Sequence, residues 1–180
     1  ADRDGDLIPD YRDPYHDANT LHQALSDSAG YRLETEPGLN LALGAVAFAV
    51  EADGTQVTAS EIAAVTGWRD DHTNVGGRFD FTLSGLPHPG AKAHVVVPQR
   101  GAIPEQAVYR LTGVVGNWQT FASNPQNTLA SAPGAPGYCP PPDDPVFTAG
   151  LTPGDYCVRL TLSDGGMNDA DGQANGRIRS

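Results

Sequence analysis

The sequence predicts an all-β protein, a β-sandwich of about eight or nine strands with an immunoglobulin-like or jelly-roll-like arrangement. Short segments with apolar residues at every second position recur along the chain, which is typical of strands with one buried face. Turn-forming residues separate these segments, since the 180 residues include 21 glycines and 15 prolines. The length suits a single domain with a sizeable core.

Strands are expected at residues 31–36, 40–50, 79–83, 91–98, 106–112, 117–122 and 156–163. Segment 40–50 is apolar on both faces, so it is predicted to be a central strand. Residues 60–64 are predicted to form one helical turn, capped by Thr58 or Ser60. The stretch SAPGAPGYCPPPDDP at 131–145 is predicted to be a rigid loop, because proline cannot donate a ladder hydrogen bond. The expected organisation is an acidic segment at 1–18, a connector at 19–30 and the sandwich at 31–180.

The two cysteines and the net charge indicate the location of the protein and the partners that it is not expected to have. Cys139 lies in the proline-rich loop and Cys157 in the last long predicted strand, so one disulfide is predicted to join them. A disulfide is typical of a secreted or surface protein. The formal net charge of -11 argues against nucleic acid or an anionic membrane as a partner. No apolar run is long enough to span a membrane.

Carboxylates in the first thirteen residues are spaced as in a calcium-binding loop. Loop positions 1, 3, 5, 9 and 12 hold Asp2, Asp4, Asp6, Asp10 and Asp13, and the backbone carbonyl of Ile8 falls at position 7. A chain that coils around calcium presents its oxygens in this way. Leu7 stands where an EF-hand has glycine, and Asp13 stands where it has glutamate. The pattern Asp-x-Asp-x-Asp, followed by Ile-Pro-Asp and a further Asp, instead resembles a thrombospondin type 3 repeat. A solvated acidic tail is the alternative.

A second set of oxygen donors lies in the Gly-rich loop after the last long predicted strand. The set comprises Asp164, Asn168, Asp169, Asp171 and Asn175. Oxygen donors of this kind suit a hard cation, and Ca²⁺ is the cofactor that we expect.

The two termini repeat one spacing. Asp4, Asp6 and Asp10 are separated by the same offsets as the last three of the C-terminal donors. We therefore hypothesise that subunits join end to end through calcium. The alternative is that each loop binds its own ion and stiffens its own end.

Five longer motifs carry a resemblance to a known family. They are TNVGGRFDF, PQRGAIPEQAVYR, GNWQTF, SAPGAPGYCPPPDD and GLTPGDYCVRLTLSDGGMNDADGQANG. Together they resemble the bacterial choice-of-anchor U domain, over about residues 31 to 176. The resemblance implies a secreted or surface-displayed module, mostly of Gram-negative bacteria, without known enzymatic activity. Such domains precede a C-terminal anchoring signal, whereas this chain ends at Ser180 without a hydrophobic tail.

The functional expectation is a calcium-binding structural or adhesive module outside the cell or on its outer surface. A calcium-dependent carbohydrate-binding adhesin is the alternative, and its partners would be surface glycans. No enzyme motif is present, so catalysis is not expected. Asp70, Asp71 and Asn74 could bind a cation, but Asx turns are the favoured interpretation of their loop. The aromatic residues are not dense enough in the sequence to predict a sugar-stacking platform.

Overall fold

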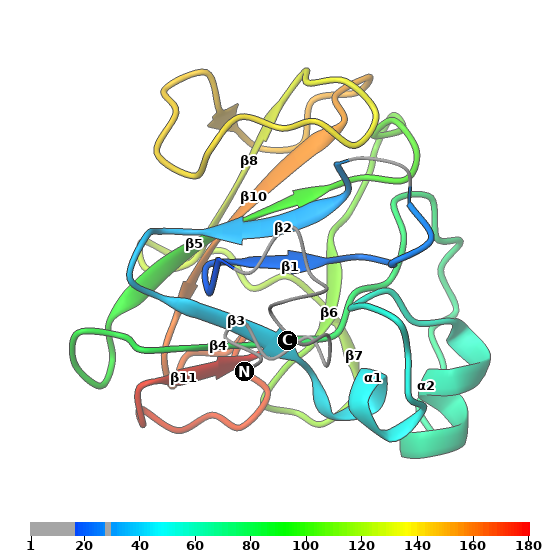
Figure 1. The fold of residues 1–180 in the computed structure, drawn as a ribbon, viewed down its shortest axis with the longest axis vertical. Helices are drawn as coiled ribbons and strands as arrows, with labels where there is room; N and C mark the ends of the chain where they lie inside the picture. Colours follow the sequence, from blue (N-terminus) through cyan, green and yellow to red (C-terminus); the bar gives the residue numbers. More distant parts are fainter. Residues whose placement is uncertain (1–16, 28–29) are drawn as a thin grey trace.

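The computed structural model describes residues 17–27 and 30–180, and this part of the chain contains eleven strands and two short helices (Figure 1). The all-β prediction is therefore confirmed. The strands are β1 (Thr20–His22), β2 (Arg32–Thr35), β3 (Asn40–Leu43), β4 (Phe81–Ser84), β5 (Lys92–Pro98), β6 (Arg110–Thr112), β7 (Trp118–Thr120), β8 (Thr128–Ala132), β9 (Thr148–Ala149), β10 (Cys157–Ser163) and β11 (Arg177–Arg179). The helices are α1 (Ala45–Ala49) and α2 (Ala59–Thr66).

The larger sheet has six antiparallel strands in the order β1-β2-β5-β10-β8-β9. Strand β10 lies in its interior, where Leu160 pairs with Val95 of β5 and with Leu129 of β8. Both faces of β10 are covered. Its residues Val158, Leu160 and Leu162 belong to the main core, whereas Cys157 belongs to a smaller cluster on the other face.

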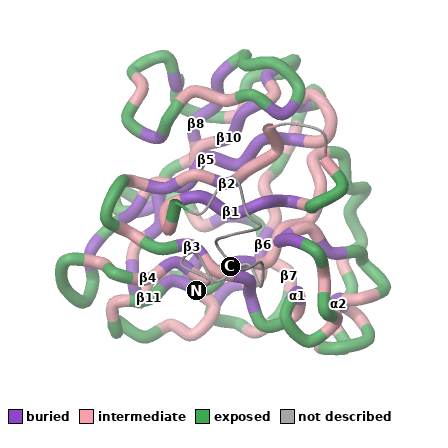
Figure 2. The backbone as a smooth tube through the Cα atoms, viewed as in Figure 1, coloured by how far each residue is buried: buried purple, intermediate pink, exposed green. Residues whose placement is uncertain are grey.

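A second sheet of three antiparallel strands, β11-β4-β3, contributes to the same main core (Figure 2). Leu41 of β3, Leu83 of β4 and Ile178 of β11 are each fully buried within it. The hairpin of β6 and β7 forms a separate two-stranded sheet, and Leu111 anchors it to this core. The main core therefore holds together all three sheets.

The prediction of one central strand over 40–50 is wrong. Strand β3 ends at Leu43, and helix α1 follows directly after Gly44. The carboxylate of Asp80 accepts a hydrogen bond from the backbone N–H of Ala47 at 2.8 Å, which satisfies a donor in the first turn of the helix. A Cβ at Gly44 would collide with this carboxylate, so glycine permits the close approach.

Other local predictions have mixed outcomes. Helix α2 begins with a capping box between Thr58 and Glu61, which confirms Thr58 as the cap. The expected connector at 19–30 contains β1, which pairs with β2. Strand β8 was not predicted and takes in the first two residues of the expected rigid loop, up to Ala132.

The disulfide between Cys139 and Cys157 is present, as predicted. It ties the loop after β8 to the start of β10, and the loop covers the smaller cluster on the outer face of the six-stranded sheet. Neither helix in the described part of the chain has the length and apolar character needed to cross a membrane.

Acidic pH is expected to weaken the contact between the end of β2 and strand β5. The Glu36 carboxylate accepts a hydrogen bond from the backbone N–H of His94 at 2.9 Å, and the His94 Nδ1 lies 2.6 Å from Oε1. Burial alone would raise the pKa of Glu36, but the hydrogen bonds from His94 and Thr35 outweigh burial and hold the pKa below its ordinary 4.5.

A carboxyl group with a depressed pKa stabilises the folded state above its unfolded pKa, and this contribution is lost as the pH falls through the folded pKa. We expect the free energy of unfolding, measured by urea titration, to decrease from about pH 5 downward. The decrease should be shallower for Glu36→Gln. If the unfolding free energy of the wild type and of Glu36→Gln fell equally steeply with pH, the role assigned to Glu36 would be contradicted.

Candidate binding cleft

The carboxylate oxygens of the predicted C-terminal calcium ligands accept hydrogen bonds mainly from backbone N–H groups. Asp164 Oδ2 accepts hydrogen bonds from the N–H of Gly90 at 2.9 Å and of Gly176 at 2.7 Å, and its Oδ1 accepts from Asn175 at 3.2 Å. Asp169 accepts from Gly165 at 2.9 Å and from Arg179 at 3.1 Å. Both aspartates are buried. Their carboxylates therefore hold the loop in shape.

The other members of this set also have partners in the chain. Asn168 exchanges two hydrogen bonds with the backbone of Ala122, and Asn175 donates to the Asp171 carboxylate at 3.1 Å. Burial raises the pKa of Asp169, with the neighbouring Asp171 charge acting in the same direction. Within the described residues these aspartates do not form a cluster of three or more potential metal ligands. Asp2, Asp4, Asp6, Ile8, Asp10 and Asp13 lie outside the described residues.

A cleft of about 980 Å³ lies among both helices, the loop from α2 to β4, the segment before β6, the β6–β7 hairpin and strand β11, and it meets the C-terminal donor set at Asp171. Ligand sites in proteins typically measure about 300–1,000 Å³, so the cleft can hold an extended ligand. Exposed apolar side chains line part of it, including Phe48 at 62% and Val108 at 52% exposure. Exposed apolar groups around a concave surface are typical of an interaction site.

Five aromatic residues that are at least partly exposed line this cleft. They are Phe48, Trp68, Phe79, Tyr109 and Trp118, whereas Phe81 behind them is buried in the main core. The Trp68 ring approaches the turn between β6 and β7, because a Cβ at Gly116 would lie 3.9 Å from it. Tyr109 packs edge-on against Phe121 with ring centroids 6.5 Å apart. Trp68 and Trp118 are the two tryptophans of the chain, and both line the cleft.

Asp70 joins the loop after α2 to strand β6. The Arg110 Nη2 donates to Asp70 Oδ1 at 2.9 Å, and the Asp70 side chain is 9% exposed. Burial alone would raise the pKa of Asp70, but the hydrogen bonds from Arg110 and the backbone of His72 outweigh it and lower the pKa. Asp70 therefore stays ionised at neutral pH and can accept hydrogen bonds from a ligand.

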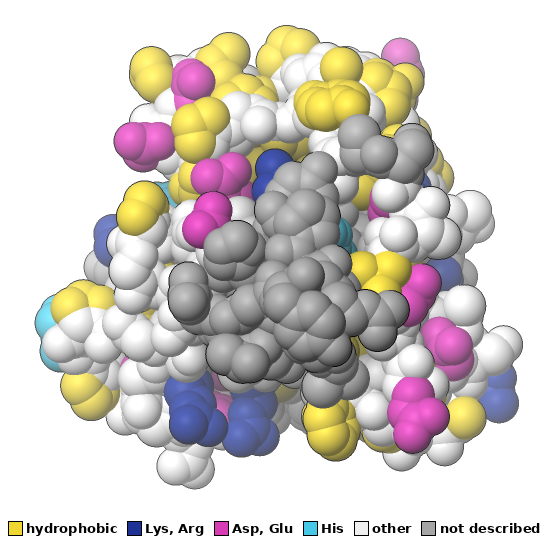
Figure 3. All heavy atoms as spheres, viewed as in Figure 1, with side chains coloured by type: hydrophobic (Ala, Val, Ile, Leu, Met, Phe, Trp, Pro, Cys, Tyr) yellow, Lys and Arg dark blue, Asp and Glu magenta, His cyan; other side chains and the backbone are white. Residues whose placement is uncertain are grey.

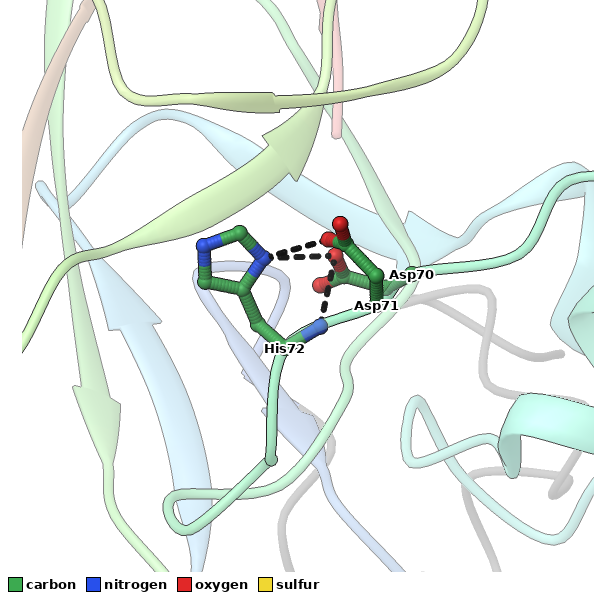
Figure 4. A group of neighbouring side chains, drawn as sticks. All are labelled: Asp70, Asp71 and His72. Carbon is green, nitrogen blue, oxygen red and sulfur yellow. Dashed lines mark hydrogen bonds and ion pairs between the residues drawn. The ribbon is translucent and has the colours of Figure 1, made fainter.

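Asp70, Asp71 and His72 lie within reach of one another beside the cleft (Figure 4). The His72 Nδ1 is 2.7 Å from Asp71 Oδ1 and 3.3 Å from Asp70 Oδ1. Among the described residues, they form the single group of carboxylate and imidazole ligands close enough to hold a metal ion. The backbone N–H of His72 lies 3.4 Å from Asp70 Oδ1, as in the Asx turn expected for this loop. Arg110 already neutralises Asp70, which disfavours an additional cation there.

The cleft is less acidic than the chain as a whole. Its lining includes the arginines Arg78, Arg110, Arg177 and Arg179 and the acidic residues Asp70, Asp80, Glu105 and Asp171. The lining is thus neutral in formal charge, whereas the chain carries -11. Basic side chains are visible over β11 at the lower edge of the face in Figure 3. A lining without net charge repels an anion less than an acidic surface does.

Comparison of the chain with protein-family models, curated proteins and solved structures finds no match. The resemblance to the choice-of-anchor U domain therefore remains a prediction from sequence motifs.

Proposed function

We propose that the protein is a secreted or cell-surface adhesive module that holds its ligand in the cleft without chemical conversion. The observation that carries this proposal is the convergence of five partly or fully exposed aromatic residues and four arginines on one large concave surface. Aromatic and arginine side chains contribute most of the binding energy at many recognition sites. The disulfide is compatible with an extracellular location.

Replacing Trp118 with alanine is expected to weaken ligand binding about tenfold or more, because a large apolar contact is lost at the cleft wall. Binding would be measured on an array of surface glycans and then by titration with the best ligand. Tyr138→Ala is the matched control, since Tyr138 is 59% exposed and lies outside the cleft lining. Equal binding by Trp118→Ala and the wild type would contradict the proposed site.

Calcium has a separate role in this proposal. The ion would neutralise the aspartates of the first thirteen residues and order a segment that has few apolar side chains. We expect Asp4→Ala or Asp6→Ala to leave the β-sheets folded and to remove calcium-dependent protection of this segment from protease. Asp143→Ala, at an exposed position, is the control. Protection that survives both N-terminal changes would count against this role.

A calcium-dependent carbohydrate-binding adhesin is the second candidate. Its cation would be held by Asp70, Asp71 and His72, the single group of potential metal ligands among the described residues, and would have to compete with Arg110 for Asp70. Such an adhesin would lose its glycan on addition of a chelator. End-to-end assembly through calcium remains a further proposal, for which sedimentation velocity with calcium and with chelator is the direct test.

A further inference from the structure

We infer that the cleft binds an anionic polysaccharide whose sugar rings carry carboxylates, an inference that rests on the proposed adhesive function. Three features of the cleft support it: arginines free to bind a carboxylate, acidic side chains able to accept hydroxyl hydrogen bonds, and aromatic rings for the apolar faces of sugars.

Two of the four arginines in the lining are available to a ligand. Arg110 is paired with Asp70 at 2.9 Å, and Arg179 lies 3.5 Å from Asp171. The side chains of Arg78 and Arg177 form no ion pair or hydrogen bond with any other described residue. Guanidinium groups bind carboxylates through two parallel hydrogen bonds, so each free arginine provides a place for one acidic sugar.

Three of the four acidic residues in the lining are engaged within the fold. Asp70 and Asp171 each have an arginine partner, and Asp80 accepts the N–H of Ala47 in the first turn of α1. Burial raises the pKa of Asp80, so its negative charge is disfavoured relative to that of an exposed aspartate. Glu105 is exposed. The arginine-paired carboxylates can accept hydrogen bonds from sugar hydroxyls without repelling an anion strongly.

Aromatic rings favour a glycan over an acidic peptide in this cleft. Trp68 and Trp118 are partly exposed and lie on different elements, the loop after α2 and strand β7. Large aromatic rings offer broad apolar faces at low entropic cost. Sugar rings present flat C–H faces of comparable size, whereas an acidic peptide offers no comparable surface. The combination of rings and free arginines therefore matches a polymer of acidic sugars.

The probe for this inference is polygalacturonate, with dextran as a neutral polysaccharide and poly-glutamate as an acidic peptide. Binding would be measured by isothermal titration calorimetry in chelator, so that calcium bridging does not contribute. We expect saturable binding of polygalacturonate and much weaker binding of the other two. The double variant Arg78→Gln/Arg177→Gln should bind at least about tenfold more weakly.

Two further variants make this result specific. Arg69→Gln/Lys92→Gln removes the same charge at exposed positions outside the cleft lining and should bind as the wild type does. Arg78→Lys/Arg177→Lys keeps the charge and should bind with intermediate affinity, because lysine lacks the planar fork. Thermal denaturation of each variant would show that it folds.

The outcomes separate this inference from the proposed function. Equal binding of dextran, with no effect of the arginine changes, would overturn the acidic preference and leave the adhesive cleft standing. Equal binding of poly-glutamate would show that the surface responds to charge alone and would overturn the glycan inference. If no polysaccharide binds while the Trp118→Ala effect persists with another ligand, the glycan inference fails alone. If that effect is also absent, the proposed function fails with it.

Discussion

Replacing both Cys139 and Cys157 with alanine is expected to lower the free energy of unfolding by about 3 kcal/mol. The two residues are 18 positions apart, and closing a loop of this length restricts the unfolded chain by about that amount in the chain-entropy model. Cys157 is fully buried beside Ala132 and Phe147, so the lost sulfur contacts add to the cost. A melting temperature lower by about 6–12 °C would accompany the change.

The measurement is urea unfolding of the wild type and the double variant under non-reducing conditions. Tyr138→Ala serves as the control, because it alters the neighbouring residue and keeps the disulfide. Reduced wild-type protein should unfold at nearly the same urea concentration as the double variant. A difference below about 1 kcal/mol between oxidised wild type and double variant would show that the loop is held in place without the disulfide.

Replacing Asp164 with alanine is expected to destabilise the protein by a similar amount, about 3 kcal/mol. The change removes the acceptor for three backbone N–H groups, those of Gly90, Asn175 and Gly176. Asp164 is 5% exposed, so water cannot fully replace the lost carboxylate. The turn before β5 and the loop before β11 would then lose their shared anchor.

The same variant distinguishes a structural role of Asp164 from calcium binding. If the carboxylate acts through the backbone alone, the loss in unfolding free energy is equal in calcium and in chelator. Asp143→Ala, which changes an exposed aspartate without a hydrogen-bonded partner in the described residues, should leave stability almost unchanged. A wild-type stabilisation by calcium that disappears in Asp164→Ala would show that this loop holds an ion.

Some features of the fold follow from short-range chemistry and could be predicted. Thr58 and Glu61 have the spacing of a capping box, and the two cysteines leave one possible pairing. The secondary structure of AVAFA at 45–49 was harder to predict, because five consecutive apolar residues are compatible with both a strand and a helix. One interaction that stabilises the helix comes from Asp80, a residue more than thirty positions away.

The candidate site was less predictable than the fold, for two physical reasons. Oxygen donors such as Asp164 and Asp169 are visible in the sequence, but their use by backbone N–H groups depends on tertiary structure. The aromatic residues of the cleft are separated by long stretches of chain. Trp68 and Trp118 line the same cleft because the loop after α2 packs beside the β6–β7 hairpin. The signal that could have been used was a turn-forming glycine shortly before each tryptophan, Gly67 directly before Trp68 and Gly116 two residues before Trp118.

The cleft can be tested most directly by intrinsic tryptophan fluorescence, since both tryptophans line it. Titration with polygalacturonate is expected to shift or quench the emission with a saturable dependence on ligand concentration. The affinity should equal that from calorimetry, and Arg78→Gln/Arg177→Gln should weaken it in parallel. Binding detected by calorimetry without any change in tryptophan emission would place the ligand outside the cleft and contradict the proposed binding site.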